Sequence, residues 1–535
     1  MHAGILPRTL SREKLALYNG TLMEHRAHAA PNAYAPFPWF VMRSREEAEE
    51  EMRRPCGRFK SPDLLEESLK FFVAEHMRRT DPLGEEQLFM ASGVPLNWQR
   101  LLAYLHEKTI IEEPRFFYER IPNDRPKIPN FSLTLSDTTG RTDGRAEAGA
   151  GFGSSLSPED ALSKTVGEAL ERYFLSIYRR ETMRYGSFAS LRGRNALDIT
   201  QLNGFLPFQK RAFPGLGCNA EASLHWVTGE EFPSRKKALL PAQLVFWNYS
   251  RDISKDANKE GVLAQSTTSG CAGHFSKEEA VLSGLLELIQ RDGFLIFWLN
   301  RISPPLLDVS FLDEPELAEL IEYVKRYRLE MKFVNTTSDI NVPSVTCIVI
   351  DNASPDGPII SLGSSTGFDI KELFLHSAME ALAVSNYADS LPTYVLPEKY
   401  VPFIDKALGR AQRLSTWKGP RMAERFAFFI SGKKQDPREL AKIAGEKKTT
   451  SEQLAYVLGE FEKLGKGYET YVYEAKDEAL GALGYHVVRT IVPQLVPLYL
   501  GEHAATLDSK RLREVPAKLG YKAASEMNPW PHPFP

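Results

Sequence analysis

Residues 153–172 read GSSLSPEDALSKTVGEALER, and they set the pattern on which the fold prediction rests. After an opening glycine turn, Ser157 stands three residues before Asp160, which is the spacing of a capping box at a helix start. Glu168 follows Ala161 by seven residues, close to two helical turns, so the two side chains lie on one face. The stretch therefore predicts a capped helix with a glutamate on a face that has apolar neighbours.

The same pattern occurs twice more along the chain. Residues 273–291 read GHFSKEEAVLSGLLELIQR, and residues 367–382 read GFDIKELFLHSAMEAL. Each begins with glycine and carries a capping-box pair. Each then places a glutamate, Glu287 or Glu380, seven residues after the residue that follows the pair. This internal repeat predicts three equivalent helices whose glutamates converge on one cavity.

Charged side chains are grouped at helical spacing in the first two of these helices. The groups are Glu168, Glu171 and Arg172 in the first helix, and Glu287, Gln290 and Arg291 in the second. For one helix alone, the simplest interpretation is a solvated face with ion pairs. The apolar residues beside these acids place them near a core instead, where half-buried carboxylates need a partner such as Mg²⁺. The planar guanidinium groups of the arginines in the same groups can donate paired hydrogen bonds to phosphate oxygens, so the pattern predicts a nucleotide triphosphate site.

Length and composition set outer limits on the protein class. At about 100–200 residues per domain, a chain of 535 residues predicts roughly two to four domains. The 66 basic and 69 acidic side chains leave a formal charge of −3, which argues against nucleic-acid binding driven by bulk charge. The four cysteines lie far apart without a CxxC pair, so a zinc ribbon is not expected. We see no signal peptide and no apolar run near the ~20 residues of a membrane span, so we expect a cytoplasmic protein that contacts no membrane.

The chain changes character near Asn130, after a segment rich in proline. The residues before this point have helical periodicity, and residues 85–108 fit either a winged helix or a small helical packing domain. Beyond it, strand-like stretches alternate with helices. The clearest strands are predicted at residues 239–247, 342–351, 359–362, 468–473 and 487–492. Residues 400–465 are charged and are predicted to form a peripheral helical layer.

One motif indicates a different chemistry. Residues 363–367, GSSTG, fit the G-x-S-x-G turn of a serine hydrolase, with Ser365 as the nucleophile. The glycine before the helix has counterparts at Gly153 and Gly273, which gives the turn a structural explanation. The hydrolase is therefore the weaker hypothesis. The glycine-rich residues 149–153 lack the lysine and hydroxyl residue of a P-loop, so they carry little weight by themselves.

Together these motifs resemble the YcaO family, and within it the cyclodehydratases of azoline-containing peptide pathways. The resemblance runs from about Leu133 to Pro535. It rests on residues 168–173, 268–292, 363–380, 487–493 and 511–512 and on the terminal Pro-His-Pro-Phe-Pro. It implies an α+β fold, in which residues 131–535 form a YcaO-type ATP-binding domain of mixed and antiparallel sheets flanked by helices. Residues 1–130 lie outside the resemblance, and their helical periodicity predicts a mainly helical N-terminal docking region. Residues 400–465 are expected to be a peripheral helical insertion.

The resemblance also implies a chemistry and a set of site residues. The family binds ATP and Mg²⁺ and activates a peptide-bond oxygen by phosphorylation, after a cysteine, serine or threonine of a ribosomally made precursor peptide attacks the carbonyl. The implied metal ligands are Glu168, Glu171, Glu279 and Glu287. The implied nucleotide-binding set comprises these four together with Lys164, Arg172, Gln290, Arg291 and Glu380. The implied catalytic residues are Pro535 and His532 of the proline-rich tail, which is either a loose end or a strand that reaches the nucleotide cavity.

Several positions depart from the family pattern. Lys164 stands where serine is common, Gln290 replaces a glutamate, Ser269 stands where asparagine is frequent, and His376 stands where arginine is frequent. Two alternatives therefore stay open: a scaffold subunit that has lost part of the site, and a relative that forms a thioamide or amidine. The implied partners are the precursor peptide, an E1-like leader-binding protein, a flavin-dependent dehydrogenase and a second copy of this chain, in a pathway such as bacteriocin biosynthesis.

Overall fold

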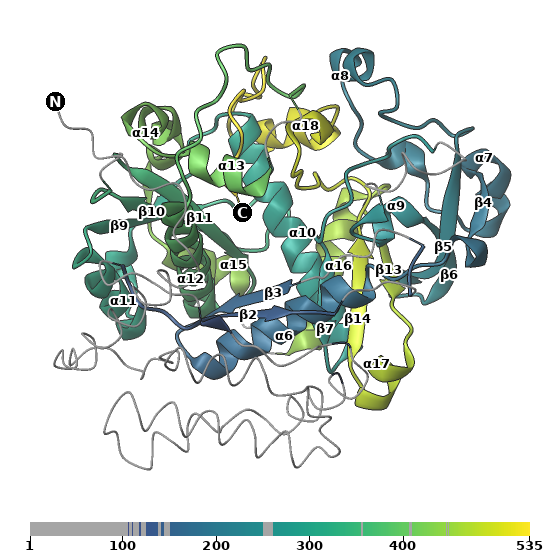
Figure 1. The fold of residues 1–535 in the computed structure, drawn as a ribbon, viewed down its shortest axis with the longest axis horizontal. Helices are drawn as coiled ribbons and strands as arrows, with labels where there is room; N and C mark the ends of the chain where they lie inside the picture. The colour runs from purple at the N-terminus through teal and green to yellow at the C-terminus, as the bar shows by residue number, and fades with distance from the viewer. Residues whose placement is uncertain are drawn as a thin grey trace, which may run out of the picture. The chain divides into compact units, whose positions relative to one another are not determined.

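The computed structural model describes residues 105, 110, 117–118, 125–136, 141–143, 150–249, 260–354, 357–405, 409–445, 447 and 449–534. Contacts within the chain divide it into the units Met1–Pro114 and Arg115–Pro535. Every strand and helix named below belongs to the second unit (Figure 1). The predicted helical N-terminal region lies almost entirely outside the described residues, and so does Pro535. The second unit begins at Arg115, ahead of the boundary expected near Asn130.

Three β-sheets form the framework of this unit. Their strands are β1 (Phe117–Tyr118), β2 (Asn130–Thr134), β3 (Ala150–Ser154), β4 (Arg184–Ser187), β5 (Ser223–Phe232), β6 (Lys236–Pro241), β7 (Cys271–His274), β8 (Leu306–Leu307), β9 (Leu329–Asn335), β10 (Ser344–Asp351), β11 (Ile359–Thr366), β12 (Lys434–Gln435), β13 (Thr470–Glu474) and β14 (His486–Ile491). The three-stranded sheet has the order β1-β2-β3, and the five-stranded sheet has the order β11-β10-β9-β8-β12. The six-stranded sheet has the order β4-β5-β13-β14-β7, with β6 paired to β5. All described pairings are antiparallel except that of β8 with β12, so the predicted mixture of antiparallel and mixed sheets is confirmed.

The three repeated motifs form the helices α6 (Pro158–Phe174), α10 (Lys277–Leu299) and α12 (Ile370–Ser390). Each helix begins where the capping pair predicts. The caps are Ser157, Ser276 and Asp369, and the side-chain oxygen of each accepts a hydrogen bond from the backbone N–H three residues later. Such a bond satisfies one of the amides that a helix start leaves without a partner, which explains why this local pattern defines the boundary so well.

Each repeated helix follows a strand: α6 follows β3, α10 follows β7, and α12 follows β11. A glycine in β3 and another in β11 let strand and helix lie in close contact. A Cβ atom added to Gly153 would lie 2.2 Å from the carbonyl oxygen of Ala161. One added to Gly363 would lie 2.4 Å from the amide nitrogen of Ala381. Gly153 therefore belongs to a strand that glycine lets approach its helix, and not to the turn that the sequence predicted.

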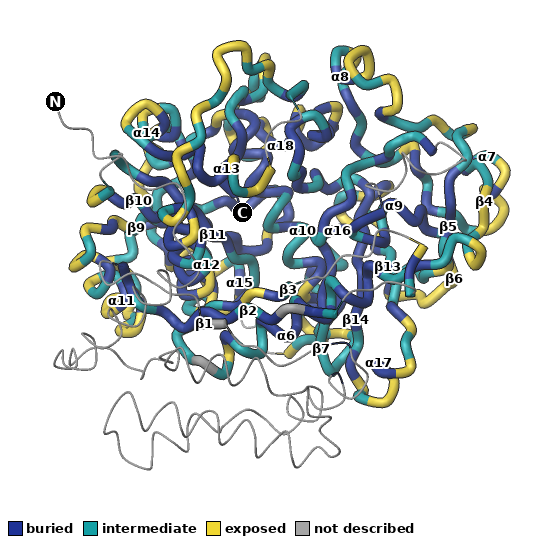
Figure 2. The backbone as a smooth tube through the Cα atoms, in the orientation of Figure 1, coloured by how far each residue is buried: buried dark blue, intermediate teal, exposed yellow. Residues whose placement is uncertain are grey.

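The helix α10 is the centre of the fold, and its last eight residues, Asp292–Leu299, are all buried (Figures 1 and 2). It contacts β14 and β7 of the six-stranded sheet and also β11 and β10 of the five-stranded sheet. Residues 294–299 are each no more than 2% exposed and pack in one apolar cluster with Trp417, Phe426 and Phe534. Burial of this aromatic surface joins the two larger sheets through one helix.

The remaining helices are α7 (Phe188–Leu191), α8 (Pro207–Ala212), α9 (Ala242–Val245), α11 (Pro315–Lys325), α13 (Arg410–Thr416), α14 (Pro420–Phe426), α15 (Arg438–Ala444), α16 (Thr450–Leu464), α17 (Glu478–Leu483) and α18 (Lys510–Lys518). The strand predicted at 239–247 is half wrong, because β6 ends at Pro241 and α9 follows. A fully buried apolar run has no hydrophobic periodicity by which a strand could be distinguished from a helix. The mostly helical character predicted for residues 400–465 appears as α13 to α16.

We expect Gly363→Ala to destabilise the protein by about 1–3 kcal/mol, because the added methyl group would meet the backbone of α12. Gly459→Ala is the matched control, since Gly459 lies inside α16 with nothing within 4 Å of an added Cβ. Alanine there should stabilise the helix by about 0.5–1 kcal/mol. Urea unfolding of both variants measures the difference. Equal shifts of the same sign would show that the close approach of β11 to α12 does not matter.

Candidate functional site

In all three strand–helix units, a glutamate almost three turns into the helix accepts a hydrogen bond from a backbone N–H in or beside the preceding strand. The donor and acceptor pairs are Phe152 to Glu168 at 2.6 Å, Gly270 to Glu287 at 2.7 Å, and Ser364 to Glu380 at 2.7 Å. The sequence predicts three equivalent glutamates, and the structure gives them the same local role. Because carboxylates accept strongly from backbone amides, each bond fixes its glutamate against the strand.

Arginines hold the other carboxylate oxygen in two of the three units. The Nη2 atom of Arg172 lies 2.6 Å from Oε1 of Glu168, and the Nη2 atom of Arg291 lies 3.0 Å from Oε1 of Glu287. Both pairs have the i, i+4 spacing that the sequence predicts. In α12 the equivalent position four residues after Glu380 is a valine, so this unit has no arginine of its own.

Further hydrogen bonds tie the three units to one another. The carboxylate of Glu171 on α6 accepts from the N–H of Gly273 on β7 at 2.8 Å. The side-chain amide of Gln290 on α10 donates to the carbonyl oxygen of Ser364 on β11 at 2.8 Å. Since the N–H of Ser364 donates to a glutamate of α12, these contacts link all three helices in one place.

The acids of this region act on each other's charge. Burial raises the pKa of Glu171 well above its ordinary value, and the neighbouring carboxylates of Glu168 and Glu287 raise it further. Burial also raises the pKa of Glu168, against the opposing charge of Arg172. Burial raises the pKa of Glu380 as well, and there Arg291 opposes the shift. The structure thus brings Glu168, Glu171, Glu287 and Glu380 together, and we call these four residues the glutamate cluster.

Two other predicted residues, Lys164 and Glu279, differ in their relation to the cluster. Burial lowers the pKa of Lys164 on α6, and the charges of Asp160 on the same helix and of Glu372 and Glu380 on α12 oppose that shift. Glu279 lies in the first turn of α10, where its carboxylate is 2.6 Å from Nδ1 of His274. The hydroxyl group of Thr450 donates a hydrogen bond to the carboxylate of Glu279. Among the residues that the structure describes, none of these partners belongs to the glutamate cluster, so Glu279 is not brought together with the other predicted ligands.

The donor chemistry of the cluster fits a magnesium ion that arrives with a nucleotide. Within the described ranges, no group of three or more His, Cys, Asp or Glu side chains could hold a metal ion by itself. Mg²⁺ rarely needs such a cage, because it is usually bound by one or two carboxylates together with water and substrate phosphates. Partly exposed carboxylates beside arginines meet that requirement, since the side chains of Glu168 and Glu287 are 32% and 25% exposed.

The C-terminal tail is fixed in the core and reaches the cluster. The N–H of Asn528 donates to the carbonyl oxygen of Leu299 at 2.7 Å, and the indole N–H of Trp417 donates to the carbonyl oxygen of Pro531 at 3.0 Å. Phe534 is fully buried, and the guanidinium carbon of Arg291 lies 4.1 Å from the centre of its ring. The loose-end alternative is therefore wrong. Pro535 itself lies outside the described residues.

His532 is part of the packing under this tail. Its Nε2 atom lies 2.8 Å from the carbonyl oxygen of Tyr499, to which it donates a hydrogen bond, and its side chain is fully buried. Burial lowers the pKa of His532 well below its ordinary value, so the imidazole is neutral near pH 7. This placement gives His532 a structural contact and no contact with a glutamate of the cluster.

Ser365 does not occupy a nucleophile elbow. It lies within β11, which continues through Thr366, and pairs across the sheet with Val345. The turn that a G-x-S-x-G elbow requires is therefore missing at this serine. In the part of the chain that the structure describes, no histidine hydrogen-bonds to the Ser365 hydroxyl, and the hydrolase prediction is wrong.

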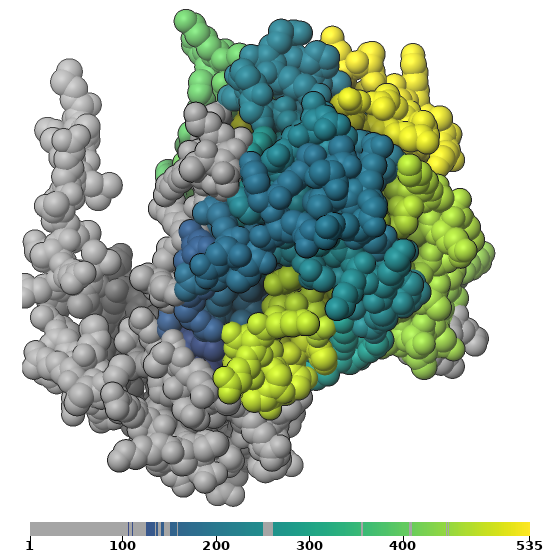
Figure 3. Space-filling model, turned by 90° about the vertical axis from the view of Figure 1, so that its right-hand side faces the viewer, coloured from purple at the N-terminus to yellow at the C-terminus, as the bar shows by residue number. Residues whose placement is uncertain are grey.

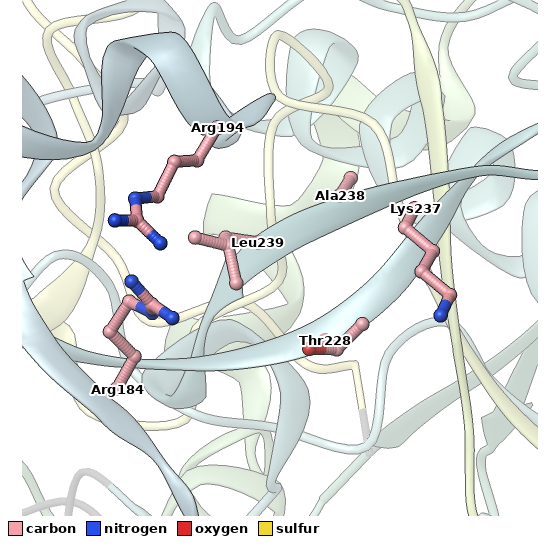
Figure 4. Close-up of a pocket in the computed structure, with 6 residues that line it drawn as sticks. All are labelled: Arg184, Arg194, Thr228, Lys237, Ala238 and Leu239. Carbon is pink, nitrogen blue, oxygen red and sulfur yellow. The ribbon is translucent and has the colours of Figure 1, made fainter.

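Two surface hollows lie elsewhere. One, of about 200 Å³, is lined by Arg184, Arg194, Thr228, Lys237, Ala238 and Leu239 (Figure 4). Figure 4 shows its two arginines pointing toward each other. The other, of about 500 Å³, is lined by residues 474–478, 480, 481 and 484–486. Figure 3 faces the side of the molecule that carries the β4–β6 region. No glutamate of the cluster lines either hollow.

What sequence reasoning missed at this site are backbone groups and distant partners. The amides of Phe152, Gly270 and Ser364 leave no signal in residue types, although the glycines around them indicate a close backbone approach. The hydrogen bond from Gln290 to a strand carbonyl was likewise not predicted.

None of the described helices combines the length and the apolar character that are needed to cross a membrane.

Comparisons with solved structures place this arrangement among known folds. A heterocyclase in complex with substrate and cofactor aligns with a TM-score of 0.60 and 18% identity, over 81% of this chain and 57% of that chain. The heterocyclase TruD aligns with a TM-score of 0.54 and 20% identity, over 70% of this chain and 50% of that chain. The YcaO protein from Methanopyrus kandleri bound with AMPPCP and Mg²⁺ has a TM-score of 0.50 and 18% identity, over 75% of this chain and 90% of that chain. The chain thus spans little more than half the length of the two heterocyclases that it matches.

Sequence comparison identifies the same group. An uncharacterized protein from Methanothermobacter thermautotrophicus is 27% identical over 151 residues, which is 28% of this chain and 38% of that protein. The family described as YcaO cyclodehydratase, ATP- and Mg²⁺-binding, matches residues 152–496. That range contains every member of the glutamate cluster and begins at the phenylalanine whose amide binds Glu168. The chain belongs to the YcaO family.

Proposed function

We propose that this protein is an ATP-dependent cyclodehydratase that converts cysteine, serine or threonine residues of a precursor peptide to azolines. The glutamate cluster carries the proposal. It gathers four carboxylates and two arginines from three helices in the part of the chain that matches an ATP- and Mg²⁺-binding family. Acids for a hard cation and guanidinium groups for phosphate are the side chains that a triphosphate site requires.

Three glutamates of the cluster and two neighbouring arginines have definite tasks in this proposal, and Glu380 completes the proposed nucleotide-binding set. Glu168, Glu171 and Glu287 would hold Mg²⁺, and Arg172 and Arg291 would face the phosphates while keeping their contacts with the glutamates. When bound, Mg²⁺ and ATP supply the phosphoryl group that activates the peptide-bond oxygen. Backbone amides already orient the carboxylates of Glu168 and Glu287, so less conformational entropy is lost when the ligands bind.

The overall reaction balances without a further reagent. The side-chain sulfur or oxygen of the substrate residue gives up its proton to solvent as it forms a bond to the preceding carbonyl carbon, and the carbonyl oxygen takes the terminal phosphoryl group of ATP. Loss of that phosphate, together with the amide proton, leaves the C=N bond of the azoline. ATP becomes ADP and phosphate, and the peptide loses the elements of one water for each ring.

The departures at Gln290 and His376 favour neither a working site nor a lost one. Gln290 is uncharged, but it ties α10 to β11 by a hydrogen bond that an ionised glutamate could not donate. The scaffold alternative, and a relative that makes a thioamide or amidine, would use the same cluster. Nucleotide turnover in the presence of peptide separates the scaffold from the enzymes, and the mass of the product separates the enzymes.

Partners belong to the same proposal. An E1-like protein would bind the leader of the precursor peptide and dock on residues 1–130. A flavin-dependent dehydrogenase would oxidise azolines to azoles, and two copies of this chain would associate. These proposals draw on the family resemblance, and co-purification of the chain with a leader-binding protein and a precursor peptide tests them.

The proposed function leads to three predictions, and the first concerns ATP turnover. Glu168→Gln and Glu287→Gln should each lower Mg²⁺-dependent ATP hydrolysis by more than about 100-fold, since even residues that only orient a metal ligand contribute about 10- to 100-fold. Glu278→Gln on the same helix is the control, because its 51% exposed carboxylate pairs with Arg235 on the surface. Phosphate release in the presence of peptide and partner is the measurement. Wild-type turnover in either cluster variant would contradict the proposal.

A second prediction uses the charge of the empty cluster. The pKa of Glu171 is raised in the folded state, so the folded protein binds more protons than the unfolded chain above the ordinary glutamate pKa. Stability is therefore lost as the pH rises through that window. Glu171→Gln should raise the melting temperature at pH 8 by about 1–3 °C and change it little near pH 5, where the wild-type group is already protonated.

Differential scanning calorimetry of the apo-protein measures this effect. Glu322→Gln, at a 68% exposed position, is the control and should be neutral at both pH values. Mg²⁺ with a non-hydrolysable ATP analogue should remove the advantage of the variant, because the ligand then neutralises the cluster. An equal gain at pH 5 and pH 8, or a loss at pH 8, would show that carboxylate repulsion is not the cause.

A third prediction concerns the tail. A peptide tag fused after Pro535 should lower ring formation by more than about 10-fold while ATP affinity and melting temperature stay near wild-type values, because Phe534 already anchors the chain and the tag extends from the end beside Arg291. Loss of one water per ring, followed by mass spectrometry, is the measurement. The same tag at the N-terminus is the control. A C-terminally tagged protein that cyclises at the untagged rate would show that the tail has no part in the chemistry.

A further inference from the structure

Two exposed aromatic rings flank the glutamate cluster. Phe152 is 40% exposed, and its ring centre lies 5.6 Å from the guanidinium carbon of Arg172, the arginine that pairs with Glu168. Tyr387 is 37% exposed and follows Glu380 by seven residues on α12, which places both side chains on one face of that helix. Large aromatic side chains that remain exposed beside a polar site indicate a surface that a ligand covers.

Arg410, the first residue of α13, lies between these rings. Its guanidinium carbon is 6.0 Å from the ring centre of Phe152 and 6.0 Å from the ring centre of Tyr387. The helix α13 packs against α12, which carries Tyr387 (Figure 1). The side chain of Arg410 is exposed, so it has room to move from the rings toward the cluster.

The charge of Arg410 is not matched by an acid. Among the described residues it makes no ion pair and no hydrogen bond, whereas Arg172 and Arg291 are each held by a glutamate. Arg410 is nevertheless within electrostatic reach of the cluster. Burial is the largest cause of the raised pKa of Glu168 and Glu380, and the charge of Arg410 is among those that oppose it at both residues.

The α12 side of the cluster needs such a cation. The residue four positions after Glu380 is a valine, so α12 lacks the i, i+4 arginine of α6 and α10. Burial lowers the pKa of His376 on the same helix to about 4, so this imidazole is neutral near pH 7. Arg410 brings a permanent charge to this side from a different helix.

We propose that Arg410 is a phosphate-binding residue that leaves the rings of Phe152 and Tyr387 and closes onto the terminal phosphate of a bound nucleotide. The inference rests on the proposed function and names the partner of one further side chain. A cation–π contact at an exposed site is weak compared with the charge-assisted, bidentate hydrogen bonds that a guanidinium group forms with phosphate. A nucleotide in the cluster would therefore draw Arg410 away from the rings.

The test compares nucleotide affinities of the full-length wild type, Arg410→Ala, Arg410→Lys and the control Arg421→Ala, an exposed arginine of α14 without an ion pair. Isothermal titration with Mg²⁺ and either a non-hydrolysable ATP analogue, ADP or adenosine gives the affinities. We expect Arg410→Ala to weaken binding of the ATP analogue by about 10- to 100-fold, to affect ADP less, and to leave adenosine unchanged. Lysine should restore part of the loss, because it keeps the charge but not the planar fork.

Three outcomes would overturn the inference. An unchanged affinity for the ATP analogue would show that Arg410 meets no phosphate. An equal loss for the ATP analogue and adenosine would place it at the base instead. A weaker affinity for the substrate peptide alone would show that Arg410 binds an acidic group of that peptide. A wild type that binds none of the three ligands contradicts the proposed function itself, so the two failures are distinguishable.

Discussion

A hydrogen bond from an amide in or beside a strand to a glutamate almost three turns into the following helix is the interaction on which this structure depends. It occurs in α6, α10 and α12, and it forms only if strand and helix lie close together. Glycines such as Gly153 and Gly363 allow that approach because a Cβ atom would meet the helix backbone. The same bond leaves one carboxylate oxygen to face an arginine or a cation. The functional site is therefore a consequence of how helix and strand pack.

This arrangement has a cost that explains its chemistry. Four carboxylates in one partly buried place repel each other, and burial raises the pKa of three of them, most strongly that of Glu171. Arg172 and Arg291 offset part of the repulsion. In the proposed function, the remaining negative charge would be neutralised by a divalent cation, which brings two positive charges in one small ion. A cluster of this kind is less stable empty than filled, as expected of a site that binds its metal with a substrate.

Local patterns were predictable from the sequence, and long-range partners were not. Capping pairs and the seven-residue spacing depend on neighbours along one helix, so the helix starts and the equivalent glutamates could be predicted. Glu279 has the same chemistry as Glu287, but eight residues separate them, which is about 12 Å along a helix. Its cap position and its contact with His274 take it elsewhere. The contacts of Gln290 and Arg410 join segments far apart in the chain, and no periodicity records them.

Neighbouring residues of α10 connect the site with the core. Arg291 faces the cluster and lies over Phe534 of the tail, whereas Asp292 forms a bidentate pair with Arg511 of α18 at 2.6 Å. Both members of that pair are at most 1% exposed, so their desolvation is offset only by a well-aligned contact. Rotation of α10 would break this buried pair and move Arg291 at the same time. The site is therefore held by the core through one helix, and groups built on such a rigid element keep their positions better than groups carried by loops.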